Sequence, residues 1–154
     1  MTRTDKENYY LNIAEAVLER GTCLRRNYGA LIVNNDTIVA TGYNGAPRGR
    51  ENCCDLGVCE RQKQGVKQGE RYELCRSVHA EQNAIIAAPR DLMLGATLYL
   101  AGHDGEGNLI EAGSCSMCRR LIINAGISRV INRISPEGYK VVNVMSEWVR
   151  EDGL

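Results

Sequence analysis

The chain has 154 residues, of which 44% are hydrophobic and 25% charged, so it can bury a core and we expect one domain over residues 1–154. Lys and Arg together number 19, as do Asp and Glu, and this zero net charge argues against a large nucleic-acid partner. No stretch approaches the roughly 20 apolar residues of a membrane helix, and residues 1–5 lack the apolar segment of a signal peptide, so we expect no membrane partner and a cytoplasmic location.

The first half of the chain predicts a helix, a hairpin and a long connection. Residues 4–20 carry an apolar stripe at the helical period. Residues 28–33 and 37–41 are β-rich and flank an Asn-Asn-Asp turn, which indicates a β-hairpin. A loop of about 30 residues is expected from 44 to 76, and loops of that length are uncommon unless they are functional or tied down.

The second half alternates helices and strands. Gly- and acid-rich residues 103–113 are expected to form an exposed loop that includes His103. The alternation after an opening hairpin predicts an α/β fold, in which a mixed sheet is covered by helices on both faces. The expected helices are 79–88, 115–125 and 145–151, and the expected strands are 96–101, 127–131 and 139–144.

Seven cysteines are a high number for a chain with no export signal. In a reducing compartment, thiols serve more often as metal ligands or buried groups than as disulfides. Because the number is odd, complete disulfide pairing within one chain is excluded.

Four residues at the starts of two expected helices have the chemistry of a catalytic zinc site. His79, Cys115 and Cys118 supply one nitrogen and two sulfur ligands, which leaves the fourth position of a tetrahedral zinc open for water. Helix N-termini favour thiolate over thiol, and residues three apart share a helical face. Glu81 is not needed as a ligand and is free to carry protons. This H-x-E…C-x-x-C arrangement is typical of zinc deaminases.

The chemistry expected of this site is hydrolytic deamination. Zinc lowers the pKa of bound water to about 7, and the resulting hydroxide attacks an amidine-like ring carbon such as C4 of cytosine. Glu81 moves the proton from the water to the ring nitrogen and then to the departing amine. Each part alone has a plainer explanation: a redox Cys-x-x-Cys pair, a structural histidine or a purely structural zinc. The four residues together favour zinc catalysis.

Three motifs stand in order along the chain: Gly42-Tyr43-Asn44-Gly45, His79-Ala80-Glu81 and Cys115-Ser116-Met117-Cys118. Together with the cysteine-rich segment between the first two, they resemble the deoxycytidylate (dCMP) deaminase family of the cytidine deaminase superfamily, over about residues 23–131. The resemblance implies a three-layer cytidine-deaminase-like fold with a five-stranded sheet, one catalytic Zn²⁺ on His79, Cys115 and Cys118, and Glu81 as proton shuttle. It also implies a nucleotide substrate, a homo-oligomer and, as in some relatives, a regulatory nucleotide.

Two further sets of residues are assigned to binding. The resemblance implies that Asn44 hydrogen-bonds the sugar of the substrate. We also expect Ala80 among the substrate-binding residues and the guanidinium groups of Arg26 and Arg48 on the phosphate. Some relatives carry a second, structural zinc, which would order the long loop. We expect its ligands here to be Cys23, Cys53, Cys59 and Cys75, with Cys54 free, and the alternative is that all five are free thiols.

Two features depart from the family pattern. Ser114 stands where the family has Pro before the first zinc cysteine, and segment 101–113 is longer than expected. Both bear on the substrate and leave the reaction class intact. We therefore expect dCMP to be converted to dUMP and ammonia. The alternatives are the same chemistry on free cytidine, deoxycytidine or an adenosine in tRNA, and a zinc-stabilised binding module without activity.

Overall fold

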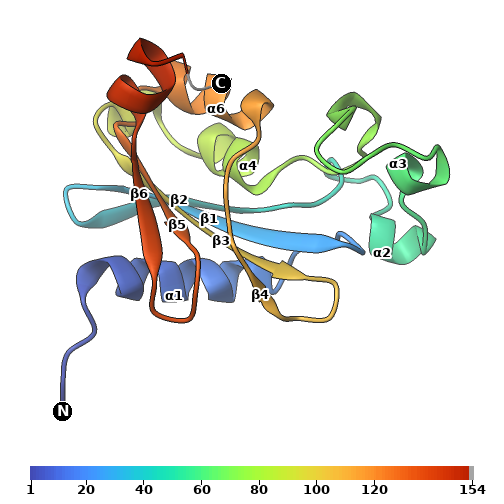
Figure 1. Ribbon diagram of the computed structural model, residues 1–154, viewed down its shortest axis with the longest axis horizontal. Helices are drawn as coiled ribbons and strands as arrows, with labels where there is room; N and C mark the ends of the chain where they lie inside the picture. The colour runs from blue at the N-terminus through green and yellow to red at the C-terminus, as the bar shows by residue number, and fades with distance from the viewer. Residues whose placement is uncertain (153–154) are drawn as a thin grey trace.

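The structure is a computed structural model in which residues 1–152 are described (Figure 1). It confirms the opening helix, the hairpin and the later alternation of helices and strands. None of the helices in residues 1–152 is both long and apolar enough to cross a membrane. The helices are α1 (Lys6–Leu18), α2 (Cys53–Leu56), α3 (Glu60–Lys63), η1 (Tyr72–Leu74), α4 (Ala80–Ala87), α5 (Arg90–Met93), α6 (Ser116–Ala125) and the π-helical η2 (Val144–Arg150). The strands are β1 (Arg26–Asn34), β2 (Thr37–Tyr43), β3 (Thr97–Asp104), β4 (Leu109–Ile110), β5 (Arg129–Arg133) and β6 (Tyr139–Asn143).

The predicted mixed sheet is confirmed. Its strand order is β2-β1-β3-β5-β6, and the short β4 pairs with β3 as a sixth strand. Only β3 and β5 are parallel, because α6 provides the crossover between them, and the other pairs are antiparallel. The exposed loop expected at 103–113 is wrong in part: His103 lies in β3 opposite Leu109 and is partly buried, with its Nε2 3.8 Å from Glu15 Oε1.

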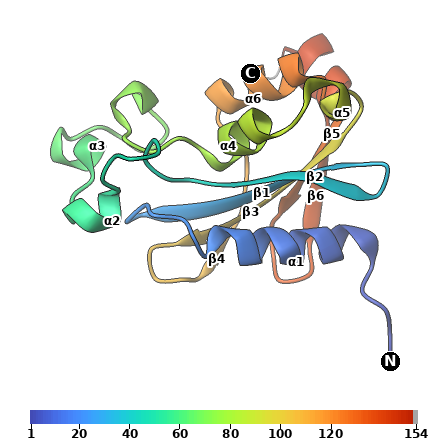
Figure 2. The ribbon, with the colours of Figure 1, turned by 180° about the vertical axis from the view of Figure 1, so that it is seen from behind.

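Helices cover both faces of the sheet. In Figures 1 and 2, α1 lies on one face while α4 and α6 lie on the other. Side chains alternate along β1, so Leu31 packs with the α1 core and Ile32 packs with the α4 and α6 core. Along β3, Tyr99 likewise packs with the α1 core and Leu100 packs with the α4 and α6 core. The three-layer α/β architecture is therefore confirmed.

Two glycines let these helices approach the sheet closely. A Cβ atom on Gly29 would lie 2.0 Å from the carbonyl oxygen of Ala14 in α1. A Cβ atom on Gly42 would lie 2.3 Å from the carbonyl oxygen of Ala80 in α4. Any larger residue at either position must push a helix away from the sheet.

The opening helix is fastened to the sheet by buried polar contacts that the sequence does not reveal. Arg133 of β5 is fully buried, and its guanidinium group donates to the side-chain oxygens of Asn8 and Asn12. Its Nη2 also lies 3.6 Å from Glu15 Oε2. The apolar pattern of the sequence predicts a strand over residues 127–131, but it does not predict that the charged Arg133 lies buried against α1.

The segment between Asn44 and His79 is more ordered than the predicted loop. It contains the short elements α2, α3 and η1, and it extends beyond one end of the sheet (Figure 1). An isolated bridge between Gly45 and Val78 closes its base. The cysteine-rich segment therefore leaves and re-enters the fold at one place, directly before α4.

Candidate metal centre

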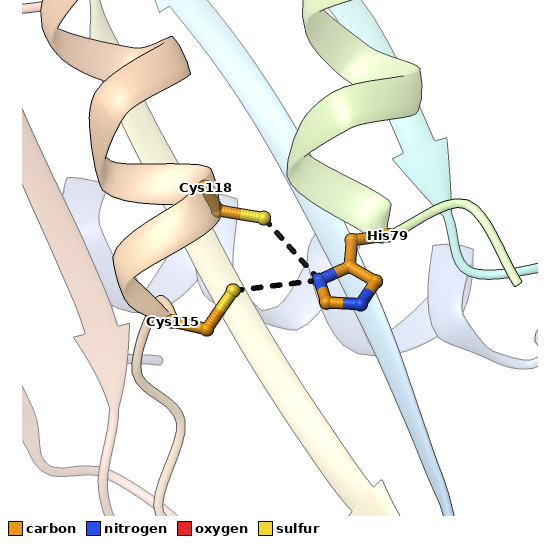
Figure 3. A group of neighbouring side chains, drawn as sticks. All are labelled: His79, Cys115 and Cys118. Atoms are coloured by element: carbon orange, nitrogen blue, oxygen red, sulfur yellow. Dashed lines mark hydrogen bonds between the residues drawn. The ribbon is translucent and has the colours of Figure 1, made fainter. Parts of the chain in front are cut away.

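The starts of α4 and α6 bring three candidate zinc ligands together (Figure 3). His79 is the N-cap residue of α4, and its backbone N–H donates to Gln82 Oε1 at 2.7 Å. Cys115 is the N-cap residue of α6, and Cys118 lies in the first turn of that helix. Each ligand therefore lies at a helix end where unpaired backbone N–H groups favour negative charge.

The geometry of this group fits a zinc ion. The Nδ1 atom of His79 lies 3.7 Å from Cys115 Sγ and 3.3 Å from Cys118 Sγ. A tetrahedral zinc with Zn–S bonds of about 2.3 Å and Zn–N bonds of about 2.0 Å places its sulfur and nitrogen ligands about 3.5 Å apart. Within residues 1–152, this is the one group of three or more His, Cys, Asp or Glu residues whose ligand atoms all lie within 4.8 Å of one another.

The ionisation of the three ligands is strongly coupled. The hydrogen bond from Cys118, together with the His79 ring, lowers the pKa of Cys115 to about 4 despite burial. The same contact with Cys115, reinforced by burial, raises the pKa of Cys118. Burial lowers the pKa of His79, but contacts with Cys115, Cys75 and Glu81 outweigh it and raise that pKa to about 10. Metal binding therefore has to release protons from the imidazole and from one thiol.

Glu81 lies in the first turn of α4 and borders the same cavity as His79. It is only 4% exposed, and burial raises the pKa of its carboxyl group. A carboxyl group with a raised pKa beside a metal site is suited to accept and return a proton near neutral pH.

Ser114, which stands where the resembled family has Pro, is buried and lies near this carboxyl group. Its hydroxyl makes no hydrogen bond of normal geometry, yet it lies close enough to Glu81 to oppose the effect of burial on the pKa of that carboxyl. Its carbonyl oxygen accepts from Arg119 Nε at 2.9 Å, which holds the segment against α6. The structure therefore places the Ser114 hydroxyl beside the carboxyl group of Glu81.

The cavity at the metal centre includes three of the four expected substrate residues. Arg26, Asn44 and Ala80 line it, whereas Arg48 is exposed and lies outside it. The Asn44 side chain is buried and bound to β1, because its Oδ1 accepts from the backbone N–H of Tyr28 at 2.8 Å and its Nδ2 donates to the Arg26 carbonyl at 3.0 Å. Each of these atoms keeps one further hydrogen-bonding position.

The four thiols expected on a second zinc also line this cavity, and Cys54 is exposed outside it. Burial, together with the charges of its three cysteine neighbours, raises the pKa of Cys53, so these thiols are near one another. They do not form a second group with all ligand atoms within 4.8 Å in the part of the chain that the structure describes. The second zinc therefore stays a prediction. Its proposed ligands are Cys23, Cys53, Cys59 and Cys75.

Other cavity residues have no signal in the sequence. Tyr28 reaches the cavity from β1, and Arg61 and Tyr72 reach it from the cysteine-rich segment. None belongs to a spaced motif, so only the folded chain shows that they line the same cavity as His79.

Comparisons with known proteins agree with this geometry. A family model described as the cytidine and deoxycytidylate deaminase zinc-binding region matches residues 4–133. The deoxycytidylate deaminase of Mycobacterium phage D29 is 35% identical over 136 residues, which cover 85% of this chain and 96% of the phage protein. The deoxycytidylate deaminase of Saccharomyces cerevisiae is 31% identical and matches 98% of this chain, which spans only 46% of the yeast protein. The crystal structure of the dCMP deaminase from cyanophage S-TIM5 in complex with dCMP and dUMP is 25% identical, with a TM-score of 0.58 over 84% of this chain and 82% of that one.

Proposed function

Because the chain belongs to the cytidine and deoxycytidylate deaminase family, we propose that it is a zinc-dependent hydrolase whose substrate is dCMP and whose products are dUMP and ammonia. The observation that carries the proposal is the meeting of three zinc-type ligands and a buried carboxyl group at one cavity. The name of the phage D29 relative, which this chain matches over 96% of its length, supports the choice of a cytosine nucleotide.

The roles proposed for the residues follow from their positions. His79, Cys115 and Cys118 would hold a zinc ion, which would supply the chemistry of an activated water at neutral pH. Glu81 would accept one proton from the attacking water and pass it to the ring nitrogen, and would then pass the second proton, taken from the hydroxyl of the adduct, to the amino group, which leaves as ammonia. One carboxyl group serves both transfers because they occur in sequence, and its burial keeps competing water away from the proton.

Substrate contacts are proposed for the residues that line the cavity. Asn44 offers its remaining donor and acceptor to the sugar, and the backbone of Ala80 borders the base. Arg26 is the proposed phosphate partner, because guanidinium groups match phosphate oxygens in pairs. Arg48 is less suited to this role in the described conformation, since it lies outside the cavity.

Replacement of Glu81 tests the reaction. The Glu81→Gln variant, loaded with zinc and given dCMP, should release ammonia about 10²- to 10⁴-fold more slowly than the wild type while its zinc content stays unchanged. The matched control is Glu106→Gln, an exposed carboxylate in the turn after β3, which should keep full turnover. Wild-type turnover by the Glu81→Gln variant would refute the role of the carboxyl group.

A substrate panel tests the choice of dCMP. Cytidine, deoxycytidine and adenosine in a tRNA should each release ammonia more slowly than dCMP does. Faster release from any of them would replace the proposed substrate and leave the deaminase chemistry in place. If the zinc-loaded protein releases no ammonia from dCMP or from any of these compounds, the result would favour the alternative that the chain is a zinc-stabilised binding module without activity.

The proposal extends to the oligomeric state, a regulatory nucleotide and the cellular location. Large apolar side chains remain exposed on the outer surface of α4, α6 and η2, notably Ile86 at 76%, Leu121 and Val149, which supports a homo-oligomer. Light scattering on the purified protein measures the mass directly. A regulatory nucleotide near Asn44 stays a prediction from the resemblance. A cytoplasmic location stays a prediction from the amino-acid sequence, and the unpaired cysteines are compatible with it.

A further inference from the structure

Three side chains stack in series from the cysteine-rich segment to the metal centre. The guanidinium carbon of Arg61 lies 4.3 Å from the centre of the Tyr72 ring. The centres of the Tyr72 and His79 rings are 4.9 Å apart, and the ring planes are 88° from one another. All three side chains border the cavity, so the stack forms part of its wall.

Arg61 is fixed in an unusual way for a buried cation. It is only 6% exposed, and none of the ion pairs found within residues 1–152 involves it. Its Nε donates to the Glu70 carbonyl at 3.0 Å and its Nη2 donates to the Lys67 carbonyl at 3.2 Å. Burial of a charge is costly unless its donors are satisfied, and these two carbonyls and the Tyr72 ring provide the compensation. The guanidinium group of Arg61 therefore links α3 to residues 67–70, which lie just before Tyr72.

The backbone then directs Tyr72 toward the metal centre. Arg71, the residue before it, has a left-handed conformation with φ of 52°, which is uncommon for a residue other than glycine and is retained only when its surroundings enforce it. The Tyr72 ring is consequently held between the Arg61 guanidinium and the His79 imidazole.

The Tyr72 ring is one of the contacts that orient the His79 ring. The hydrogen bond from the His79 backbone N–H to Gln82 fixes the main chain, while the ring itself contacts Cys75, Cys115 and Cys118 and packs against the Tyr72 ring. Only an orientation with Nδ1 toward Cys115 and Cys118 places a ligand atom at the metal. A perpendicular aromatic neighbour favours one ring orientation over the others.

We propose that Tyr72, braced by Arg61, is a positioning residue that holds the His79 imidazole with Nδ1 toward the two cysteine sulfur atoms. The cysteine-rich segment thereby sets the zinc affinity of the catalytic centre. The inference rests on the proposed role of His79 as a zinc ligand, but it does not depend on which nucleotide is the substrate.

Zinc affinity, measured without substrate, tests the inference. The full chain is titrated against a chromophoric chelator as wild type, Tyr72→Leu and Tyr72→Phe. The Leu variant should bind zinc about tenfold more weakly, as is found when supporting contacts to metal ligands are removed. The Phe variant keeps the ring and should stay within about twofold of the wild type, because the hydroxyl has no part in the contact.

A double-mutant cycle tests whether Arg61 affects zinc binding through its contact with Tyr72. Arg61→Gln should also weaken zinc binding, and the combination of Arg61→Gln with Tyr72→Leu should be no weaker than Tyr72→Leu alone, because Arg61 acts through the ring. Additive losses would show that Arg61 works independently of Tyr72 and would overturn that part of the inference.

One result would overturn the positioning role itself, namely a Leu variant with wild-type zinc affinity. A fall in turnover at that unchanged zinc affinity would show that Tyr72 acts on the substrate instead. Circular dichroism of the metal-free proteins establishes that each variant is folded, and Tyr72→Met, which keeps bulk without a ring, replaces the Leu variant if that protein is unfolded.

Discussion

Gly42→Ala should damage the metal centre by moving α4. The added Cβ would lie 2.3 Å from the Ala80 carbonyl oxygen and 2.4 Å from the Ala84 backbone nitrogen, the two atoms that bond within α4. Both are backbone atoms, so no side-chain rotation relieves the clash. Ordinary contact begins at 3.4 Å, which means that the helix must retreat by about 1 Å. His79 moves with it, whereas zinc bond lengths tolerate about 0.2 Å.

The magnitudes follow from that displacement. Overpacking typically costs about 1–3 kcal/mol of unfolding free energy, which lowers the Tm of a chain of this size by roughly 2–12 °C. A shift of about 1 Å in a catalytic group costs about 10²-fold in turnover. Thermal denaturation, chelator competition for zinc and ammonia release from dCMP measure the three effects on one preparation.

Gly29→Ala provides the matched control. Its Cβ would lie 2.0 Å from the Ala14 carbonyl oxygen, so it displaces α1 on the opposite face of the sheet. Its Tm should fall by a similar amount while zinc affinity and turnover, per folded molecule, stay near wild type. Equal zinc affinity and equal turnover in the two variants would refute the reasoning that α4 alone carries the effect.

Three further predictions concern the rest of the molecule. Tyr10→Phe removes a 2.6 Å hydrogen bond to Asp36 that raises the pKa of Tyr10 to about 12. Because the pKa of Tyr10 is higher in the folded than in the unfolded protein, the hydrogen bond contributes stability below pH 10 that is lost as the pH rises toward 12. Tyr10→Phe should therefore be about 1 kcal/mol less stable than the wild type at pH 7 in urea unfolding. The difference should shrink between pH 10 and pH 12. Arg133→Lys should lower the unfolding free energy by about 2 kcal/mol in the same assay, because one ammonium cannot satisfy Asn8, Asn12 and Glu15 together, and an unchanged midpoint would contradict this. Metal analysis of the wild type should give two zinc ions per chain if the cysteine-rich segment holds a second one, and a firm value of one would end that idea.

The sequence suffices for the parts of the molecule that local patterns determine. The helix start at His79 and the crossover helix after Cys115 follow from periodicity and from residue types at short spacing. The hairpin follows from Asn35 and Asp36, which adopt the left-handed conformation that its turn requires. These features depend on neighbours within a few residues, so they can be read before the chain is folded.

The missed features depend on contacts between distant segments. Arg133 meets Asn8 across 125 positions, and nothing in either local sequence marks the pair. Tyr72 and Arg61 lie in a segment without periodicity, and the contacts of Tyr72 with Arg61 and with His79 exist only in the folded chain. The length of residues 101–113 is evident from the sequence, but the extension of β3 and its pairing with β4 are not.

The placement of β3 between His79 and Cys115 has a consequence for how the protein acquires its metal. A ribosome releases the histidine well before the two thiols, and the parallel partner β5 that seats α6 against the sheet emerges later still. A nascent chain that stops before residue 115 therefore offers zinc a single imidazole from this centre and no means of retaining it. Zinc held at this centre, as distinct from the site predicted in the cysteine-rich segment, thus reports that the starts of α4 and α6 have been brought together.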